Sequence, residues 1–278
     1  MIETFPRSTT LPLQSPLFWV AHKDRYLRQL LIRDIQIDTG RCLIVYFCNC
    51  NDPDAQIDGN DDVFISELLN ACAGSPVDLL LETNGGNTDS TEKICALLRT
   101  GAPDLRVIVP RRAKSNGTVI AFSGQKILMG LESELGPIDP SVGNIPVEFV
   151  LNAPANSFGP IDMQIAETAR KQTQKLANDL LSSGMLKGKS SDELKLIIEK
   201  IATRGHYHSH GSVIDYKEAT ALGFNVEAHD GKSELWKKVI LLRAMYQFDI
   251  SQQQYAKIFE GERVSLVVAA KQPDTKSP

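Results

Sequence analysis

The segment VIVPRRAKSNGTVIAFSGQKILMGLESELGPIDP, residues 107–140, is the part of the sequence that decides the fold. It begins with Val107-Ile108-Val109, a β-branched apolar run that is typical of a buried strand. Pro110 ends regular strand pairing, and the small residues of Ala113–Thr118 then lead into a short apolar segment that predicts a helix start. A side chain in such a turn lies beside the free N–H groups of the helix. Ser115 is therefore the first candidate nucleophile.

A second role is open to Ser115. Serine is a common N-cap, a residue whose hydroxyl accepts a hydrogen bond from the first backbone N–H groups of a helix. The segment by itself does not separate a cap from a nucleophile. A catalytic role requires a second element that faces the hydroxyl.

A second turn with paired glycines lies upstream of this segment. Val77–Leu81 predicts another buried strand, and it runs into Glu82-Thr83-Asn84-Gly85-Gly86. Paired glycines after a strand let the backbone approach a ligand closely and present N–H groups to an oxyanion. One helix and one strand fit between the two turns, which is the length of a right-handed crossover, so both turns are expected at the same edge of a sheet. We therefore expect Gly85 or Gly86, together with Asn116, to form an oxyanion hole.

Several short segments carry a resemblance to a known family. They are Thr83–Gly86, Val109-Pro110, Ala113–Ser115, Gly117-Thr118 and Ser133–Pro140, with further matches up to Gly223. These residues resemble the serine dehydrogenase proteinase family, a branch of the Clp-peptidase/crotonase superfamily that also includes signal peptide peptidase A. The resemblance covers most of residues 40 to 245. It implies a Clp-peptidase/crotonase-like ββα superhelix with a helical C-terminal part, a serine peptidase activity on a peptide or protein substrate, and a homo-oligomer.

The resemblance does not identify the base that would activate the serine. A serine hydroxyl is a poor nucleophile unless a neighbouring group takes its proton. Clp peptidases carry a histidine at the place where this chain has Asp139, and the only histidine cluster is His206–His210. We predict that His210 or His208 reaches Ser115 while Asp139 orients the imidazole, because triads are recognised by geometry rather than by chain order.

A lysine is the alternative base, as in signal peptide peptidase A. Lys114 precedes the serine directly and is expected to point elsewhere, and Lys126 lies on the next predicted strand. The H-x-H-x-H spacing of residues 206–210 also allows a metal site on a strand, but no other motif in the chain completes one. We therefore expect no metal. No cofactor is expected either, because a dinucleotide fingerprint of the G-x-G-x-x-G type is absent from the sequence.

Composition and charge exclude some partners. The net charge of −4 and the pI near 5.8 give no electrostatic case for binding nucleic acid or an anionic membrane. No run approaches the roughly 18 apolar residues of a membrane span. The first twenty residues lack a basic segment followed by an apolar one, so we expect no secretory signal and a cytoplasmic protein.

Cysteine usage points to the same compartment. The five cysteines are odd in number and lie in or beside apolar segments, so buried free thiols in a reducing compartment are expected. They are Cys42, Cys48, Cys50, Cys72 and Cys95. Cys48 and Cys50 form a C-x-C pair, but no second pair at zinc spacing accompanies it.

The alternation of strand and helix patterns predicts an α/β fold with a mainly parallel sheet. Expected strands are 42–47, 77–81, 106–109 and 126–129. Expected helices are 21–37, 63–73, 89–98, the segment after Ser115, 162–181, 191–202, 216–222 and 233–246. Residues 141–160, rich in Gly and Pro, are expected to be a long loop. The resemblance implies that this loop lies near the substrate groove.

These patterns together with the resemblance imply three regions. Residues 1–39 are expected to be an extended arm and an amphipathic helix, residues 40–250 the Clp/crotonase-like domain, and residues 251–278 an extension with a disordered tail. Three functions remain open: a serine endopeptidase, a catalytically weak assembly or binding subunit, and a crotonase-like acyl-CoA enzyme that uses the same oxyanion hole without a nucleophilic serine.

Overall fold

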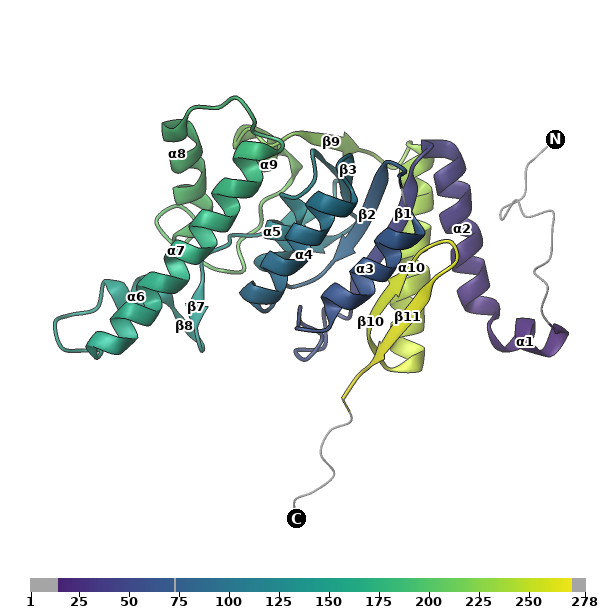
Figure 1. The fold of residues 1–278 in the computed structure, drawn as a ribbon, viewed down its shortest axis with the longest axis horizontal. Helices are drawn as coiled ribbons and strands as arrows, with labels where there is room; N and C mark the ends of the chain where they lie inside the picture. The colour runs from purple at the N-terminus through teal and green to yellow at the C-terminus, as the bar shows by residue number, and fades with distance from the viewer. Residues whose placement is uncertain (1–14, 73, 272–278) are drawn as a thin grey trace, which may run out of the picture.

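Seven strands form one sheet in the computed structural model, which describes residues 15–72 and 74–271. The order is β11-β10-β1-β2-β3-β5-β9, in which β1, β2, β3, β5 and β9 run parallel and β10 and β11 add antiparallel strands beside β1 (Figure 1). The strands are β1 (Cys42–Cys48), β2 (Val77–Glu82), β3 (Leu105–Val109), β5 (Lys126–Gly130), β9 (Val226–His229), β10 (Tyr255–Glu260) and β11 (Ser265–Ala269).

Helices cover both faces of this sheet. The helices are α1 (Pro16–Ala21), α2 (Lys23–Thr39), α3 (Asp61–Ala71), α4 (Thr88–Gly101), α5 (Asn116–Ala121), α6 (Val147–Leu151), α7 (Pro160–Ser183), α8 (Ser191–Ala202), α9 (Tyr216–Ala221) and α10 (Glu234–Gln253). One apolar core joins α2 and α10 to one face, and a second joins α3, α4, α5 and part of α7 and α8 to the other. All six residues of β2 are buried, as expected for a parallel strand covered on both sides. No helix in the described part of the chain is long and apolar enough to cross a membrane.

A second row of short extended segments stands beyond the ends of the parallel strands. β4 (Arg112–Ala113) follows β3 and pairs in parallel with β6 (Glu134–Leu135), which follows β5. Single bridges extend this row from Thr83 to Ala113 and from Leu135 to Ile214. Each unit thus consists of a long strand, a short strand and a helix. The predicted α/β class with a ββα arrangement is confirmed.

The segment after Pro140 is more ordered than the sequence indicates. β7 (Ser141–Val142) and β8 (Ile145–Pro146) form a hairpin, and α6 follows within the region predicted to be a loop. These elements and the N-terminal half of α7 extend away from the sheet as one protruding unit (Figure 1). The unit has its own small core, made by Val147, Val150 and Ala166. The loop prediction was wrong because the hairpin and helix are too short to show a period.

The two ends of the chain also differ from expectation. Residues 16–21 form α1 instead of an extended arm, because the Ser15 hydroxyl accepts a hydrogen bond from Phe18 N and Pro16 occupies the first helical position. The predicted amphipathic helix is confirmed as α2. At the other end, β10 and β11, from the region assigned to an extension, join the central sheet. Residues 1–14 of the arm and residues 272–278 of the predicted disordered tail lie outside the described residues.

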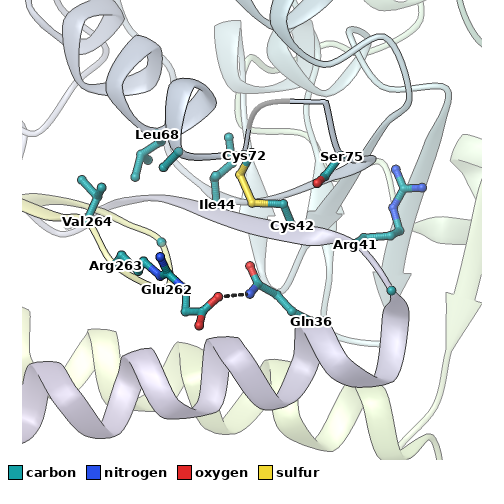
Figure 2. Close-up of a pocket in the computed structure, with 13 residues that line it drawn as sticks. Gln36, Arg41, Cys42, Ile44, Leu68, Cys72, Ser75, Glu262, Arg263 and Val264 are labelled. Atoms are coloured by element: carbon teal, nitrogen blue, oxygen red, sulfur yellow. Dashed lines mark hydrogen bonds between the residues drawn. A yellow bond between two sulfur atoms is a disulfide. The ribbon is translucent and has the colours of Figure 1, made fainter. Parts of the chain in front are cut away.

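The cysteines are not all free. Cys42 at the start of β1 and Cys72 at the end of α3 form a disulfide, with a distance of 5.8 Å between their Cα atoms. Figure 2 shows this bond in the wall of a cavity of about 440 Å³ between α2, α3 and the turn from β10 to β11. Five free thiols were therefore a wrong prediction, since the sequence does not show that two cysteines 30 positions apart meet. The prediction of a reducing compartment, which depended on all five cysteines being free thiols, therefore loses its support.

The remaining thiols are free and shielded. Cys48 and Cys95 are buried, and Cys50 is partly buried. Burial raises the pKa of Cys48 far above the usual range and raises the pKa of Cys50 and of Cys95 to about 12. Because the thiolate is the reactive form, these thiols are poor nucleophiles at ordinary pH.

We expect the cysteines of the native protein to resist iodoacetamide at mildly alkaline pH without reductant. Denaturant alone should expose Cys48, Cys50 and Cys95 to alkylation, and denaturant with reductant should add Cys42 and Cys72. Peptide mapping by mass spectrometry reads each site separately. Alkylation of Cys42 or Cys72 in denaturant without reductant would contradict the disulfide.

Candidate active site

Ser115 lies in a turn of unusual backbone geometry between β4 and α5. Its φ of 52° and ψ of −123° are a conformation that non-glycine residues rarely adopt. Such a turn between a strand and a helix projects the side chain out of the backbone. Ser115 occupies the N-cap position of α5, but its hydroxyl makes no capping hydrogen bond. The capping alternative is therefore wrong, and the described residues provide no hydrogen-bond partner for this hydroxyl.

The glycine-rich turn after β2 meets this serine directly. A Cβ atom on Gly85 would lie 2.8 Å from Ser115 Cβ and 2.9 Å from Lys114 O, so only glycine fits between the two turns. Gly85 also has a φ of 101° and Gly86 a φ of 153°, conformations that favour glycine. The two turns that the sequence places at one edge of the sheet are therefore in contact.

Two backbone amides at this contact are free. Gly85 N donates to Thr83 Oγ1 at 3.1 Å, whereas Gly86 N and Asn116 N donate to no acceptor among the described residues. Asn116 is the first residue of α5, where helix geometry leaves the N–H without an intrahelical partner. Gly86 and Asn116 thus present two unpaired donors beside the Ser115 turn, an arrangement able to bind an oxyanion.

The side chain of Asn116 joins the two turns. Its Nδ2 donates to Gly86 O at 2.6 Å and lies 3.1 Å from Thr88 Oγ1 at the start of α4. This bond fixes the direction of the Gly86 peptide relative to α5. Only the backbone of Asn116 was predicted to take part in the site, and this role of its side chain was missed.

The opposite side of the glycine turn is supported by residue 57. Ile57 N donates to Gly85 O, and Asn87 N donates to Ile57 O, both at 2.9 Å. A Cβ atom on Gly86 would lie 2.4 Å from Ile57 N, so this support requires glycine as well. The turn is held between Ile57 on one side and Ser115 on the other.

A buried lysine fixes the segment that carries Ile57. Lys257 of β10 is 1% exposed, and its Nζ donates to Asp58 at 2.7 Å and to Asp61 at 2.9 Å. Tyr46 donates to Asp61 Oδ2 at 2.5 Å. Burial alone would lower the pKa of Lys257, but the hydrogen bonds with the two carboxylates raise it, so the ammonium is charged. The C-terminal strand β10 thereby contributes to the order of the candidate site.

The segment Ser133–Pro140 lies against the serine turn on its remaining side. The Thr118 hydroxyl of α5 donates to Ala113 O at 2.7 Å and accepts from Gly136 N at 3.0 Å. This contact brings Asp139 to the cleft beside Ser115. The cleft has a volume of about 400 Å³, and its lining includes Ser115, Gly86, Asn116, Asp139 and His210.

Asp139 and His210 form a pair in this cleft. His210 Nδ1 lies 2.7 Å from Asp139 Oδ1, and Asp139 is only 4% exposed whereas the His210 side chain is 39% exposed. A proton on Nδ1 that binds the carboxylate leaves Nε2 as the basic nitrogen. Asp139 Oδ2 accepts a further hydrogen bond from Arg204 Nε at 2.9 Å. The pairing of Asp139 with a histidine was predicted, whereas Arg204 was missed because no motif in the sequence gives a signal for it.

The other candidate bases are bound elsewhere. Lys114 Nζ donates to Ser212 O at 2.8 Å and forms an ion pair with Glu134 at 3.1 Å. Lys126 pairs with Glu227 at the other end of β5. His208 Nδ1 lies 3.1 Å from Arg204 O, and its side chain is exposed.

The histidine cluster does not gather around one point. His206 Nε2 lies 3.5 Å from Glu218, His208 contacts Arg204 O, and His210 contacts Asp139. Within the described ranges, no group of three or more His, Cys, Asp or Glu residues could hold a metal ion. Only His210 of the cluster lines the cleft that holds Ser115.

Comparisons with known proteins show which family this chain resembles. Residues 56–260 match the profile of a family described as ClpP-like SDH-type serine proteinase. The chain is 30% identical over 195 residues to the uncharacterized protein MJ0137 of Methanocaldococcus jannaschii, covering 66% of this chain and 67% of the relative. It is 28% identical over 160 residues to the uncharacterized protein MJ1495 of the same organism, covering 55% of this chain and 53% of that one. A mutant of ClpP1 from Listeria monocytogenes aligns with a TM-score of 0.47 and 14% identity, covering 75% of this chain and 99% of that chain.

We expect Asn116→Ala to lower the free energy of unfolding by about 1–2 kcal/mol, because it removes a buried donor and leaves Gly86 O unpaired. Urea unfolding measures this loss as a lower midpoint concentration, with the dependence of the unfolding free energy on urea concentration unchanged. Asn51→Ala, at an exposed turn, is the matched control and should change stability by less than about 0.5 kcal/mol. Equal stability of the two variants would show that the Asn116 side chain does not hold the turns together.

Proposed function

The chain belongs to the family of ClpP-like SDH-type serine proteinases, and we propose that it hydrolyses peptide bonds with Ser115 as the nucleophile. The observation that carries the proposal is the contact between the Ser115 turn and the Gly85-Gly86 turn, which leaves two unpaired amides beside a projecting hydroxyl. A turn that only connects a strand to a helix does not require a projecting hydroxyl beside two unpaired amides. Acyl transfer does, since it requires a nucleophile and an oxyanion hole at the distance of one carbonyl group.

The proposed reaction begins with attack of Ser115 Oγ on the carbonyl carbon of a peptide bond. His210 Nε2 takes the hydroxyl proton, and Asp139 holds the imidazole through Nδ1 and stabilises its charged form. The oxyanion of the tetrahedral intermediate accepts hydrogen bonds from Gly86 N and Asn116 N; one such donor is worth about 100- to 1,000-fold in rate. His210 then gives its proton to the leaving amine, and a water molecule hydrolyses the acyl-enzyme by the same steps.

The imidazole and the hydroxyl are both in the cleft but are not hydrogen-bonded to each other in the free protein. Catalytic hydrogen bonds are often long without substrate and shorten in the complex. The half-exposed side chain of His210 has room to move, while its carboxylate partner is buried and fixed. We therefore assign the closing movement to His210 and the fixed position to Asp139.

We also propose that the active form is a homo-oligomer built through the protruding unit. This unit exposes large apolar side chains that a monomer leaves in water: Ile145, Phe149, Ile161 and Ile165. Ile161 is 75% exposed on the first turn of α7. Ile161 and Ile165 are four residues apart on α7 and so share one face, and neighbouring exposed apolar side chains are typical of protein–protein contacts.

The oligomer proposal predicts a mass above that of one chain in sedimentation velocity at micromolar concentration. The double substitution Ile161→Asp and Ile165→Asp should shift the mass towards the monomer, because it buries two charges in the contact. Leu196→Asp, at an exposed apolar residue of α8, is the control and should leave the mass unchanged. A monomeric native chain would refute the proposal.

The peptidase proposal predicts covalent labelling by a fluorophosphonate probe. Ser115→Ala should abolish labelling, and His210→Ala should lower the labelling rate by at least about 1,000-fold. Lys114→Met, His208→Ala and Ser209→Ala should label as the native chain does, since these side chains are bound or exposed outside the proposed machinery. Intact-mass spectrometry with time measures each rate.

Other outcomes separate the remaining functions. Labelling that survives His210→Ala but not Lys114→Met would replace the histidine base by a lysine. A native chain that does not label but binds an acyl-CoA ester would be a crotonase-like enzyme, and one that does neither would be a binding or assembly subunit.

A further inference from the structure

Asp139 binds the side chains of His210 and Arg204, of which the proposed reaction uses only His210. Its Oδ1 lies 2.7 Å from His210 Nδ1 and its Oδ2 lies 2.9 Å from Arg204 Nε. We propose that Arg204 is a positioning residue that fixes the Asp139 carboxylate for His210 and sets the pH at which His210 is a neutral base. This inference rests on the proposed function.

The position of Arg204 is itself strongly constrained. Its side chain is 18% exposed, and its guanidinium lies over the ring of Phe149, 5.2 Å from the centroid. Its backbone N donates to Glu148 Oε2, so two residues of α6 hold it. A surface arginine that only solubilises the protein would not be held at both its side chain and its backbone.

The backbone next to Asp139 is hydrogen-bonded to the end of α8, close to Arg204 in the sequence. Ile138 N donates to Ile201 O at 2.7 Å, at the end of α8 and three residues before Arg204. Arg204 and His210 lie on one segment after α8, whereas Asp139 comes from an earlier part of the chain. Arg204 binds Oδ2 of Asp139, and His210 binds Oδ1. Asp139 is therefore held between the two, with little freedom to rotate.

The charge of Arg204 acts on His210 through the shared carboxylate. A lone buried carboxylate stabilises an imidazolium and so keeps a histidine protonated to higher pH. Arg204 offsets that negative charge and favours the neutral imidazole that can accept a proton from Ser115. The other charged or titratable groups near the pair are Asp52 across the cleft, Glu148 on α6, His208 on the same segment, and the Lys114–Glu134 ion pair behind residue 212. None of these groups forms a hydrogen bond or ion pair with Asp139; in the described part of the chain only His210 and Arg204 do.

Two substitutions separate the charge of Arg204 from its geometry. Arg204→Gln removes the charge and keeps an N–H donor for Asp139. Arg204→Lys keeps the charge and loses the planar Nε–H contact. The first readout is the chemical shift of the histidine C2–H resonances as a function of pH. The His210 resonance is assigned as the one that is absent from the spectrum of His210→Gln. The second readout is the pH dependence of kcat/KM for a peptide substrate.

For Arg204→Gln we expect the titration of His210 and the acid limb of kcat/KM to move together to higher pH by about 0.5–1 unit. For Arg204→Lys we expect no such movement, but about a tenfold loss of kcat, because the carboxylate is less well oriented. Arg99→Met, which removes an exposed charge on α4, is the control and should change neither readout.

An unmoved His210 titration in Arg204→Gln would overturn the proposal, as would an equal shift in Arg99→Met. Circular dichroism and urea unfolding exclude a folding defect, and Arg204→Lys supplies a second folded variant. The resonance titration needs no catalysis, so it tests the coupling of Arg204, Asp139 and His210 even if fluorophosphonate labelling of the native chain fails. That failure would refute the peptidase proposal and leave this measurement valid.

Discussion

The close approach of two backbone turns is the constraint on which the candidate site depends. At the contact there is no space for a single Cβ atom, because one on Gly85 would meet Ser115 and one on Gly86 would meet Ile57. Gly86 and Asn116 can line the same cleft only because glycine lets the two backbones approach this closely. The seven-stranded sheet, the short strands beyond its edge and the helix starts all serve to bring these turns to that distance.

Polar bonds hold this contact from both sides. Behind the glycine turn, the charged Lys257 binds two carboxylates and orders the segment of Ile57. In front of it, the Asn116 amide spans the two turns. Breaking a buried ion pair by removing one partner costs about 3–5 kcal/mol, so such a group is a strong restraint on the backbone around it. The amides and the carboxylate of the site are thus held by several contacts, whereas the His210 side chain is 39% exposed.

The sequence predicts the parallel core well and the edges poorly. Val77–Leu81 and Val107–Val109 are apolar strands, and the turns after them contain the glycines and the serine. The local sequence is therefore enough to predict both strands and both turns. The strands β10 and β11 were missed because Lys257 and Glu260, both buried in β10, are polar residues whose partners lie far away in sequence. Arg204 was missed for the same reason, since its role exists only through Asp139 and Phe149. Pairings between distant residues leave no local pattern.

The location of Arg204 has a consequence for communication within an assembly. Phe149 and Glu148, which hold the guanidinium and the backbone of this arginine, belong to the protruding unit, whereas Asp139 belongs to the cleft. If the chain assembles through this unit and His210 is the base, as proposed, a partner that immobilises α6 restricts His210 through Arg204 and Asp139. Thermodynamic linkage makes this effect mutual: a peptide that orders the imidazole must tighten the quaternary contact by the same free energy.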